Sequence, residues 1–168
     1  MGYALIIDDD EKMVESITTL MSDHGLSLDS ANTWDEGFAG FLATSPELVI
    51  ADYNLPGSKH GLRLLFEIAR LRPTVRLILF SAYVTKDDVG RIEDLGLADL
   101  VLQKLNPVAS GRTLLSEVAA ARDRALGETN WTNFAASARR GRRVTDEDLE
   151  QLDGFLREHR LPRGTVHP

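Results

Sequence analysis

Five polar side chains in this sequence follow four separate apolar segments, each long enough to form a strand. They are Asp8 and Asp9 after the segment 3–7, Asp52 after 48–51, Ser81 after 75–80, and Lys104 after 98–102. Continuous apolar segments of this length indicate buried strands of a parallel sheet, whose carboxyl ends meet at one edge. We therefore expect three carboxylates, one hydroxyl and one ammonium group to share a single crevice.

Such a set of groups is suited to phosphoryl transfer. Three neighbouring carboxylates repel one another, and a hard divalent cation such as Mg²⁺ relieves that repulsion through its oxygen ligands. Carboxylates are also established covalent acceptors of phosphoryl groups. Asp52 would be the acceptor, Lys104 would neutralise charge on the phosphoryl oxygens, and Ser81 would donate a hydrogen bond to one of them.

Each residue also has a simpler explanation. The acidic run from Asp8 to Glu11 suits the positive N-terminal end of a helix, and Asp52 precedes a Pro-Gly turn of the kind that aspartate often starts. Ser81 is explained equally well as a loop hydroxyl, and Lys104 as a solvated surface lysine. The complete set indicates a shared site more specifically than any one member does. Without such a site, four separate strand ends would have to carry suitable polar groups by chance.

The segments between these strands carry apolar residues at helical spacing. The expected strands are 3–7, 26–31, 48–52, 75–80 and 98–102, and the expected helices end near His24, begin at Thr33, lie between Gly61 and Pro73, and span 85–96 and 107–126. Thr33 with Glu36, and Thr85 with Asp88, have the spacing of capping boxes. Alternating strands and helices predict a doubly wound α/β fold with right-handed crossovers.

The C-terminal part of the chain is expected to form a short helical extension. Thr145 and Asp148 have capping-box spacing, and Leu149 begins an apolar face, so we expect a helix over 146–159. A second short helix is expected near Trp131 and Phe134. The cluster Arg139–Arg143 is interpreted as a solvated linker, with a nucleic-acid or acidic-surface contact as the alternative. The extension would pack on the main domain, pair with a second copy or dock on a partner, and the sequence leaves these open.

Composition excludes several classes of protein. The 168 residues include no cysteine, so disulfide and thiolate chemistry are excluded, and 43% are hydrophobic, as in globular proteins. Residues 127–168 carry seven basic and seven acidic side chains, so the net charge of −7 lies entirely in residues 1–126. That balance argues against a nucleic-acid surface there. The absence of a signal peptide and of an apolar run near the roughly 18 residues of a membrane span predicts a cytoplasmic location.

The segments Ile6–Asp10, Leu48–Gly57, Leu77–Ala82 and Leu102–Lys104 resemble the motifs of the receiver domain of two-component response regulators. The resemblance covers about residues 3–126 and implies a flavodoxin-like (βα)5 fold with strand order 2-1-3-4-5. Asp52 would then be the phosphoacceptor and would receive its phosphoryl group from a histidine kinase or histidine phosphotransfer protein. The chain would be a signalling domain rather than an enzyme. Asp8, Asp9, Asp52 and the backbone carbonyl of Asn54 would hold Mg²⁺, and Ser81 and Lys104 would contact the phosphoryl group.

The resemblance also implies how the signal would leave the domain. Residues 1–126 would form the receiver and 127–168 an extension of unknown role. A downstream protein would bind the face formed by the helix 85–96, the strand 98–102 and the helix 107–126, or the extension itself, with a homodimer as another outcome. The signal would be a population shift of that face.

Three positions depart from the family's pattern. Leu105 stands where proline usually follows the lysine, Val101 replaces an aromatic residue, and the loop from Asp52 to Gly61 is one residue longer. His60 in that loop is expected to be exposed, with a partner contact as the alternative. These departures motivate a second hypothesis, a degenerate receiver that acts as a phosphorylation-independent interaction module.

A third hypothesis is a Mg²⁺-dependent phosphohydrolase of similar α/β topology. Asn54 counts against it, because a second aspartate is expected two residues after Asp52 in such enzymes.

Overall fold

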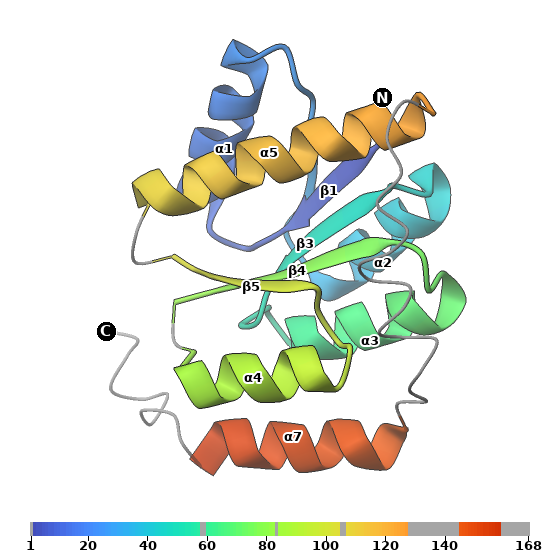
Figure 1. The fold of residues 1–168 in the computed structure, drawn as a ribbon, viewed down its shortest axis with the longest axis vertical. Helices are drawn as coiled ribbons and strands as arrows, with labels where there is room; N and C mark the ends of the chain where they lie inside the picture. Colours follow the sequence, from blue (N-terminus) through green and yellow to red (C-terminus); the bar gives the residue numbers. More distant parts are fainter. Residues whose placement is uncertain (1, 58–59, 83, 105–106, 128–144, 159–168) are drawn as a thin grey trace.

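The computed structural model describes residues 2–57, 60–82, 84–104, 107–127 and 145–158. Strands and helices alternate along the chain (Figure 1). In chain order they are β1 (Ala4–Ile7), α1 (Glu11–Asp23), β2 (Asp29–Ala31), α2 (Trp34–Thr44), β3 (Leu48–Asp52), α3 (Gly61–Leu71), β4 (Arg76–Ser81), α4 (Lys86–Asp94), β5 (Leu100–Gln103), α5 (Pro107–Ala125) and α7 (Asp146–Glu158). None of the helices in these ranges is both long and apolar enough to cross a bilayer.

The five strands form one parallel sheet with the order β2-β1-β3-β4-β5, which confirms the order expected from the sequence. Asp52 at the end of β3 pairs in register with Phe80, one residue before Ser81. Ser81 in turn pairs with Gln103, the residue before Lys104. The register therefore places the functional candidates of three neighbouring strands at the same level of one sheet edge.

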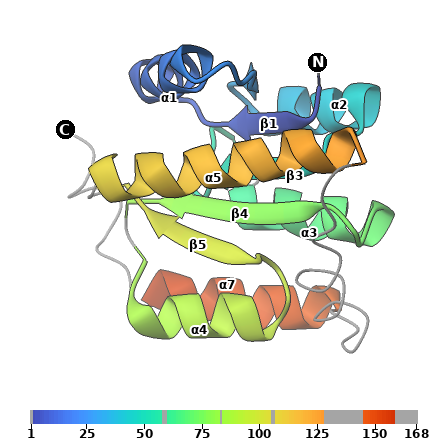
Figure 2. The same ribbon diagram turned by 45° about the horizontal axis from the view of Figure 1, so that its top comes forward.

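Successive strand residues face opposite sides of the sheet, and each side is covered by helices (Figure 2). In β3, Val49 and Ala51 pack with residues of α2 and α3, whereas Leu48 and Ile50 pack with residues of α1 and α5. Both sets are fully buried. Burial on both faces explains why these strands are continuously apolar rather than alternating.

The second strand is shorter than the sequence predicted, because β2 begins at Asp29 rather than near Leu26. The amide of Leu26 donates to the carbonyl of Met21 and so closes the end of α1. The amide of Ser27 donates to the Tyr3 hydroxyl at 2.6 Å. These two bonds use the donors that a longer strand would need for the ladder with β1.

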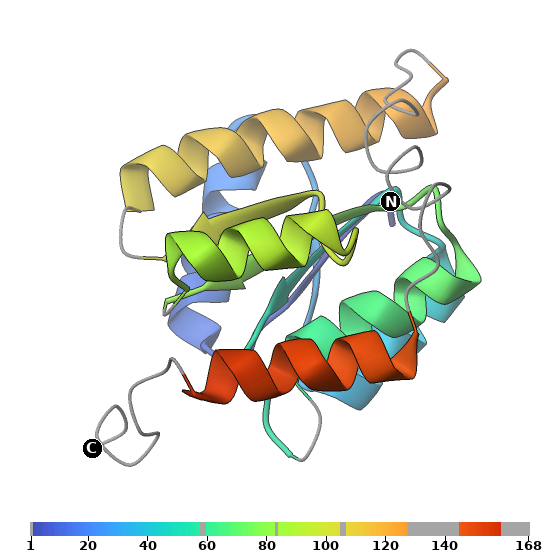
Figure 3. The same ribbon diagram turned by 60° about the horizontal axis from the view of Figure 1, so that its bottom comes forward.

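The C-terminal helix α7 packs on the main domain (Figures 1 and 3). It begins as expected, with reciprocal bonds between the amide of Thr145 and the Asp148 carboxylate (3.0 Å) and between the amide of Asp148 and the Thr145 hydroxyl (3.1 Å). Leu149 and Leu152 are buried against the domain, which confirms the predicted apolar face at these two positions. The expected helix near Trp131 and the cluster Arg139–Arg143 lie outside the described residues.

Candidate functional site

The carboxyl ends of three strands bring a cation and two carboxylates into direct contact. Lys104 Nζ, just after β5, lies 2.6 Å from Asp8 Oδ2 after β1 and 3.3 Å from Asp52 Oδ2 at the end of β3. Asp8 and Ser81 are fully buried, and Asp52 is 6% exposed. Groups that are up to 96 positions apart in sequence therefore share one crevice, as the strand ends predicted.

The acidic run after β1 divides between two tasks. Asp10 caps α1, because its carboxylate accepts a hydrogen bond from the Met13 amide at 3.1 Å. Asp8 instead points into the crevice, and its second oxygen accepts from the Asp10 amide at 2.9 Å. Asp9 is exposed at the rim of the crevice. The helix-terminus explanation therefore holds for Asp10 but does not account for the buried Asp8.

The acids of the crevice fit a hard divalent cation. Asp8, Asp9 and Asp52 each offer one carboxylate oxygen, and these three atoms lie within 4.8 Å of one another. The donor set consists of oxygen atoms, which suit Mg²⁺. The role of the Asn54 carbonyl as a further ligand stays a prediction.

The described residues of the crevice carry more acidic than basic groups. The pKa of Asp52 is raised from 3.8 to about 7, chiefly by burial and further by the charge of Asp8, although Lys104 opposes the shift. The pKa of Lys104 is also raised, because the attraction of Asp52 and Asp8 outweighs the burial of its ammonium group. One ammonium does not offset the desolvation of Asp52, and a bound cation would favour the ionised carboxylate.

Lys104 is positioned by the sheet itself. Its amide donates to the carbonyl of Ser81 at 3.0 Å and extends the β4–β5 pairing by one residue. Its ammonium also lies 5.4 Å from the ring centroid of Phe80. Sheet pairing therefore positions the backbone of Lys104 whichever residue follows it. Residues 105–106 lie outside the described part of the chain.

Glycine at position 61 is required where α3 approaches the end of β3. A Cβ at Gly61 would lie only 1.8 Å from the Asp52 carbonyl oxygen. The Gly61 amide donates to the carbonyl of Tyr53 at 2.8 Å. Any larger residue would push α3 away from the strand end that carries Asp52.

His60 differs from the exposed loop residue that the sequence predicted. Its ring stacks on the buried ring of Tyr53, with centroids 4.8 Å apart and planes 3° apart. Its Nδ1 accepts from the Arg63 amide at 3.2 Å, so His60 is the N-cap of α3. The sequence signal for this role was its position directly before Gly61 and the apolar stripe of the helix.

The comparisons with known proteins point to one family. A family model described as the response regulator receiver domain matches residues 4–110. Nitrate/nitrite response regulator protein NarL of Escherichia coli is 27% identical over 150 residues, which are 88% of this chain and 68% of that protein.

Solved structures of receiver domains share the fold. A CheY-like receiver domain protein from Methanospirillum hungatei is 24% identical with a TM-score of 0.60, over 72% of this chain and 96% of its own. Response regulator protein TrrA from Thermotoga maritima, in complex with Mg²⁺-BeF, is 24% identical with a TM-score of 0.59, over 70% of this chain and 99% of its own. Since the family model covers well over half of the sequence, the chain belongs to the response regulator receiver domain family of two-component signalling systems.

Proposed function

We propose that the chain accepts a phosphoryl group on Asp52 in a Mg²⁺-dependent reaction and thereby switches a partner-binding surface. The observation that carries the proposal is the contact of Lys104 Nζ with both Asp8 and Asp52 in a buried crevice. The ionised Asp52 oxygen would attack the phosphorus atom, and the bond between phosphorus and the donor would break with its electron pair leaving on the donor. Mg²⁺, when bound by Asp8, Asp9 and Asp52, would supply neutralisation of the phosphoryl oxygens.

The other residues of the crevice would stabilise the transferred group. Lys104 would pair with a phosphoryl oxygen, and the Ser81 hydroxyl would donate to another. Later hydrolysis of the acyl phosphate would return Asp52 to its carboxylate form. The binding of Mg²⁺-BeF by the Thermotoga maritima relative supports carrying this chemistry over to the present chain.

The fold suggests the context of this reaction. We infer that the donor is a histidine kinase or a histidine phosphotransfer protein and that the location is cytoplasmic. Residues 1–126 would be the receiver and 127–168 its extension. The output would pass to a downstream protein through the α4-β5-α5 face or through the extension, with a homodimer as a further possibility for the assembly.

Mass spectrometry after incubation with acetyl phosphate and Mg²⁺ tests the proposal. The native chain should gain one phosphoryl group, and the Asp52→Asn chain should gain none. Omission of Mg²⁺ is the control for the cation. No added mass on the native chain would overturn the proposal and favour the degenerate, phosphorylation-independent receiver.

A further inference from the structure

The helix α7 closes a groove between α3 and α4. Leu149 and Leu152 of α7 are 3% and 4% exposed and join the core on the side of the sheet that α3 covers. The fully buried Ile92 of α4 belongs to the same cluster. The receiver family model ends at residue 110, so α7 is a segment added to the matched domain.

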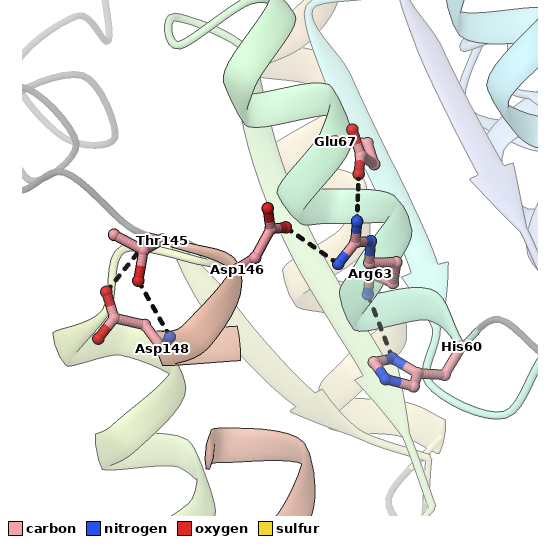
Figure 4. Close-up of polar contacts among 6 residues, drawn as sticks. All are labelled: His60, Arg63, Glu67, Thr145, Asp146 and Asp148. Carbon is pink, nitrogen blue, oxygen red and sulfur yellow. Dashed lines mark hydrogen bonds and ion pairs between the residues drawn. The ribbon is translucent and has the colours of Figure 1, made fainter. Parts of the chain in front are cut away.

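A polar contact at the start of α7 adds to these apolar contacts. One ion pair joins its first turn to α3, with Arg63 Nη1 3.2 Å from Asp146 Oδ1, while the other nitrogen of Arg63 pairs with Glu67 at 2.9 Å (Figure 4). The side chains of Arg63 and Asp146 are 36% and 61% exposed, so this pair contributes little to stability.

The contact between α4 and α7 is also incomplete. A surface pocket of about 290 Å³ opens to solvent between the two helices, lined by Arg91, Asp94, Leu95, Asp148, Gln151 and Leu152. The two helices therefore leave solvent-accessible space along part of their contact. Within residues 145–152, the buried apolar contacts of α7 are those of Leu149 and Leu152, so a shift of α3 or α4 would act directly on the two leucines.

The two helices that form the groove both begin at the candidate phosphorylation site. α3 follows β3 and approaches Asp52 closely at Gly61. From there the contacts run through Tyr53 stacked on His60, and through His60 capping the amide of Arg63, to the residue that binds α7.

The start of α4 is tied to the site from the other side. α4 follows β4, which ends at Ser81, and begins at the Thr85–Asp88 capping box. The carbonyl of Val84 accepts from the Gln103 side chain at 2.9 Å, next to Lys104. A displacement of Ser81 toward a new partner would therefore be carried to the first turn of α4.

We propose that the groove between α3 and α4 is a helix-binding surface, that α7 occupies it in the unmodified chain, and that phosphoryl transfer to Asp52 releases α7. The inference rests on the proposed function. A phosphoryl group between Asp52, Ser81 and Lys104 would draw these side chains toward its oxygens and shift the first turns of α3 and α4. Because α7 contacts both α3 and α4, a change in their relative position would lower its affinity for the groove. Phosphoryl transfer can release α7 only through such a difference in affinity between the two states.

The released groove would bind a partner helix of the same chemistry as α7. Such a helix presents two leucines three positions apart and carboxylates in its first turn, as α7 does with Asp146, Glu147 and Asp148. Arg63 would meet those carboxylates, and the leucines would fill the apolar floor. This is the helix-in-groove mode of recognition.

A spin label on α7 measures its position in the full chain. The sequence has no cysteine, so Glu150→Cys, at an exposed position of α7, gives a single labelling site. In the unmodified protein the label should broaden amide signals of α3 and α4. The added pair Leu149→Asp and Leu152→Asp should abolish the broadening, and the matched change Glu147→Gln should not. Asp146→Lys is a milder variant that leaves the leucines in place and should weaken the broadening. Broadening absent in the unmodified chain would overturn the inference.

Beryllofluoride with Mg²⁺, a mimic of the phosphoryl group, tests the release. The ratio of docked to released α7 should fall by about fivefold or more, the usual size of a coupling between two sites. Amide signals of Asp52 and Ser81 report separately whether the mimic binds. If those signals respond and the broadening persists, the release is disproved while the proposed function stands. If they do not respond, the proposed function fails and this inference fails with it.

A peptide covering residues 144–158 tests the groove itself. Added to the unlabelled Leu149→Asp and Leu152→Asp chain, the peptide should shift amide signals of α3 and α4. The same peptide should cause much smaller shifts in the native chain, because the tethered α7 competes at high effective concentration. A variant chain whose signals do not respond to the peptide would disprove the helix-binding surface.

Discussion

Charged side chains gather at both edges of the sheet, but the two sets are built differently. At the amino edge, Glu117 and Glu47 each face a guanidinium. Arg76 at the start of β4 donates to Glu117 of α5 through two hydrogen bonds of 2.7 and 2.9 Å. Glu47, just before β3, lies between Arg72 at 2.9 Å and Arg124 at 2.8 Å.

The carboxyl edge has the opposite balance. There, among the residues that the structure describes, Asp8 and Asp52 share the ammonium of Lys104, and Asp9 lies close by. The pKa of Asp52 is raised to about 7 chiefly by burial, so a full negative charge on this carboxylate is costly without a further cation.

The contrast separates charges that stabilise the fold by pairing with one another from charges that a bound ligand would stabilise. Paired groups such as Arg76 and Glu117 bind one another through directed hydrogen bonds and do not need a bound ion. An excess of buried acid does the reverse, because a bound cation would offset its negative charge. If this interpretation is right, removing charge should stabilise the carboxyl edge and destabilise the amino edge.

The largest effect is expected for Asp52→Asn. The folded-state pKa of Asp52 lies above the ordinary 3.8, so the folded chain binds more protons than the unfolded chain between about pH 4 and 7. The free energy of unfolding therefore falls as the pH rises through this window, and the ionised Asp52 destabilises the fold above it. Asparagine removes that penalty, and the Asp52→Asn chain should be more stable than the native chain at pH 8 by up to about 4 kcal/mol.

Urea unfolding at pH 5 and pH 8 without divalent cations measures this difference. The gain from Asp52→Asn should be less than half as large at pH 5, where Asp52 stays protonated in the folded chain. The exposed Asp23→Asn change serves as the control and should alter stability by less than about 0.5 kcal/mol at either pH. A gain that is equal at both pH values would contradict the raised pKa.

The next largest effect is expected at the amino edge, with the opposite sign. Glu117→Ala leaves the guanidinium of Arg76 buried without its bidentate partner, because these side chains are only 15% and 9% exposed. The chain should lose about 3 kcal/mol of unfolding free energy, as when one partner of a buried ion pair is removed. Glu15→Gln, at an exposed position, is the control.

Glu117→Ala should still accept a phosphoryl group on Asp52 under conditions where it is folded. A loss of acceptance in a folded variant would mean that the amino edge also serves the chemistry, and the separation of the two edges would then fail.

Lys104→Met should impair chemistry more than folding. The substitution removes the cation that contacts Asp8 and Asp52, so the pKa of Asp52 should rise above 7 and the phosphoryl oxygens should lose a partner. The rate of phosphoryl uptake from acetyl phosphate should fall by about 100-fold, the usual loss for one preorganised donor. Rates should be measured by mass spectrometry at saturating Mg²⁺, with Lys86→Met, an exposed lysine, as the control. An unchanged rate would mean that Lys104 stabilises the fold, like the pairs at the amino edge, and does not serve phosphoryl transfer.

The carboxyl edge was predictable from the sequence and the amino edge was not. Asp8, Asp52, Ser81 and Lys104 each follow a continuous apolar strand, and the parallel sheet brings all strand ends together. That rule needs no knowledge of side-chain contacts, which is why the fold and the proximity of Asp8, Asp52 and Lys104 could be predicted. The shorter second strand was missed because its start depends on a bond from Ser27 to the Tyr3 hydroxyl.

The missed contacts depend on helix packing rather than on strand order. Arg76 and Glu117 are 41 positions apart with no local signal linking them. The stacking of His60 on Tyr53 and the seat of α7 against Arg63 likewise arise only when helices are placed. The sequence predicted the apolar face of α7 at Leu149 and Leu152, but it did not predict which surface of the domain this face covers.

The smallest effect, expected for Arg72→Lys, sharpens the comparison by keeping the charge and changing only its geometry. The Arg72 guanidinium donates to the carbonyls of Ser45 and Pro46 at 2.6 and 2.8 Å as well as to Glu47. A lysine ammonium keeps the charge but lacks the planar fork that reaches all three acceptors.

If the amino edge is held by geometry, Arg72→Lys should cost about 1 kcal/mol of unfolding free energy, the usual net worth of a lost hydrogen bond. Arg70→Lys, which keeps the charge at the exposed last turn of α3, is the matched control in the same urea titration. A loss that disappears in the control and persists at high salt would identify directed bonds rather than net charge as the stabilising feature, because salt screens the charge but leaves the geometry of the fork intact. Equal stability of the Arg72→Lys and native chains would instead mean that charge alone suffices at the amino edge, and the distinction from the carboxyl edge would then be one of balance only.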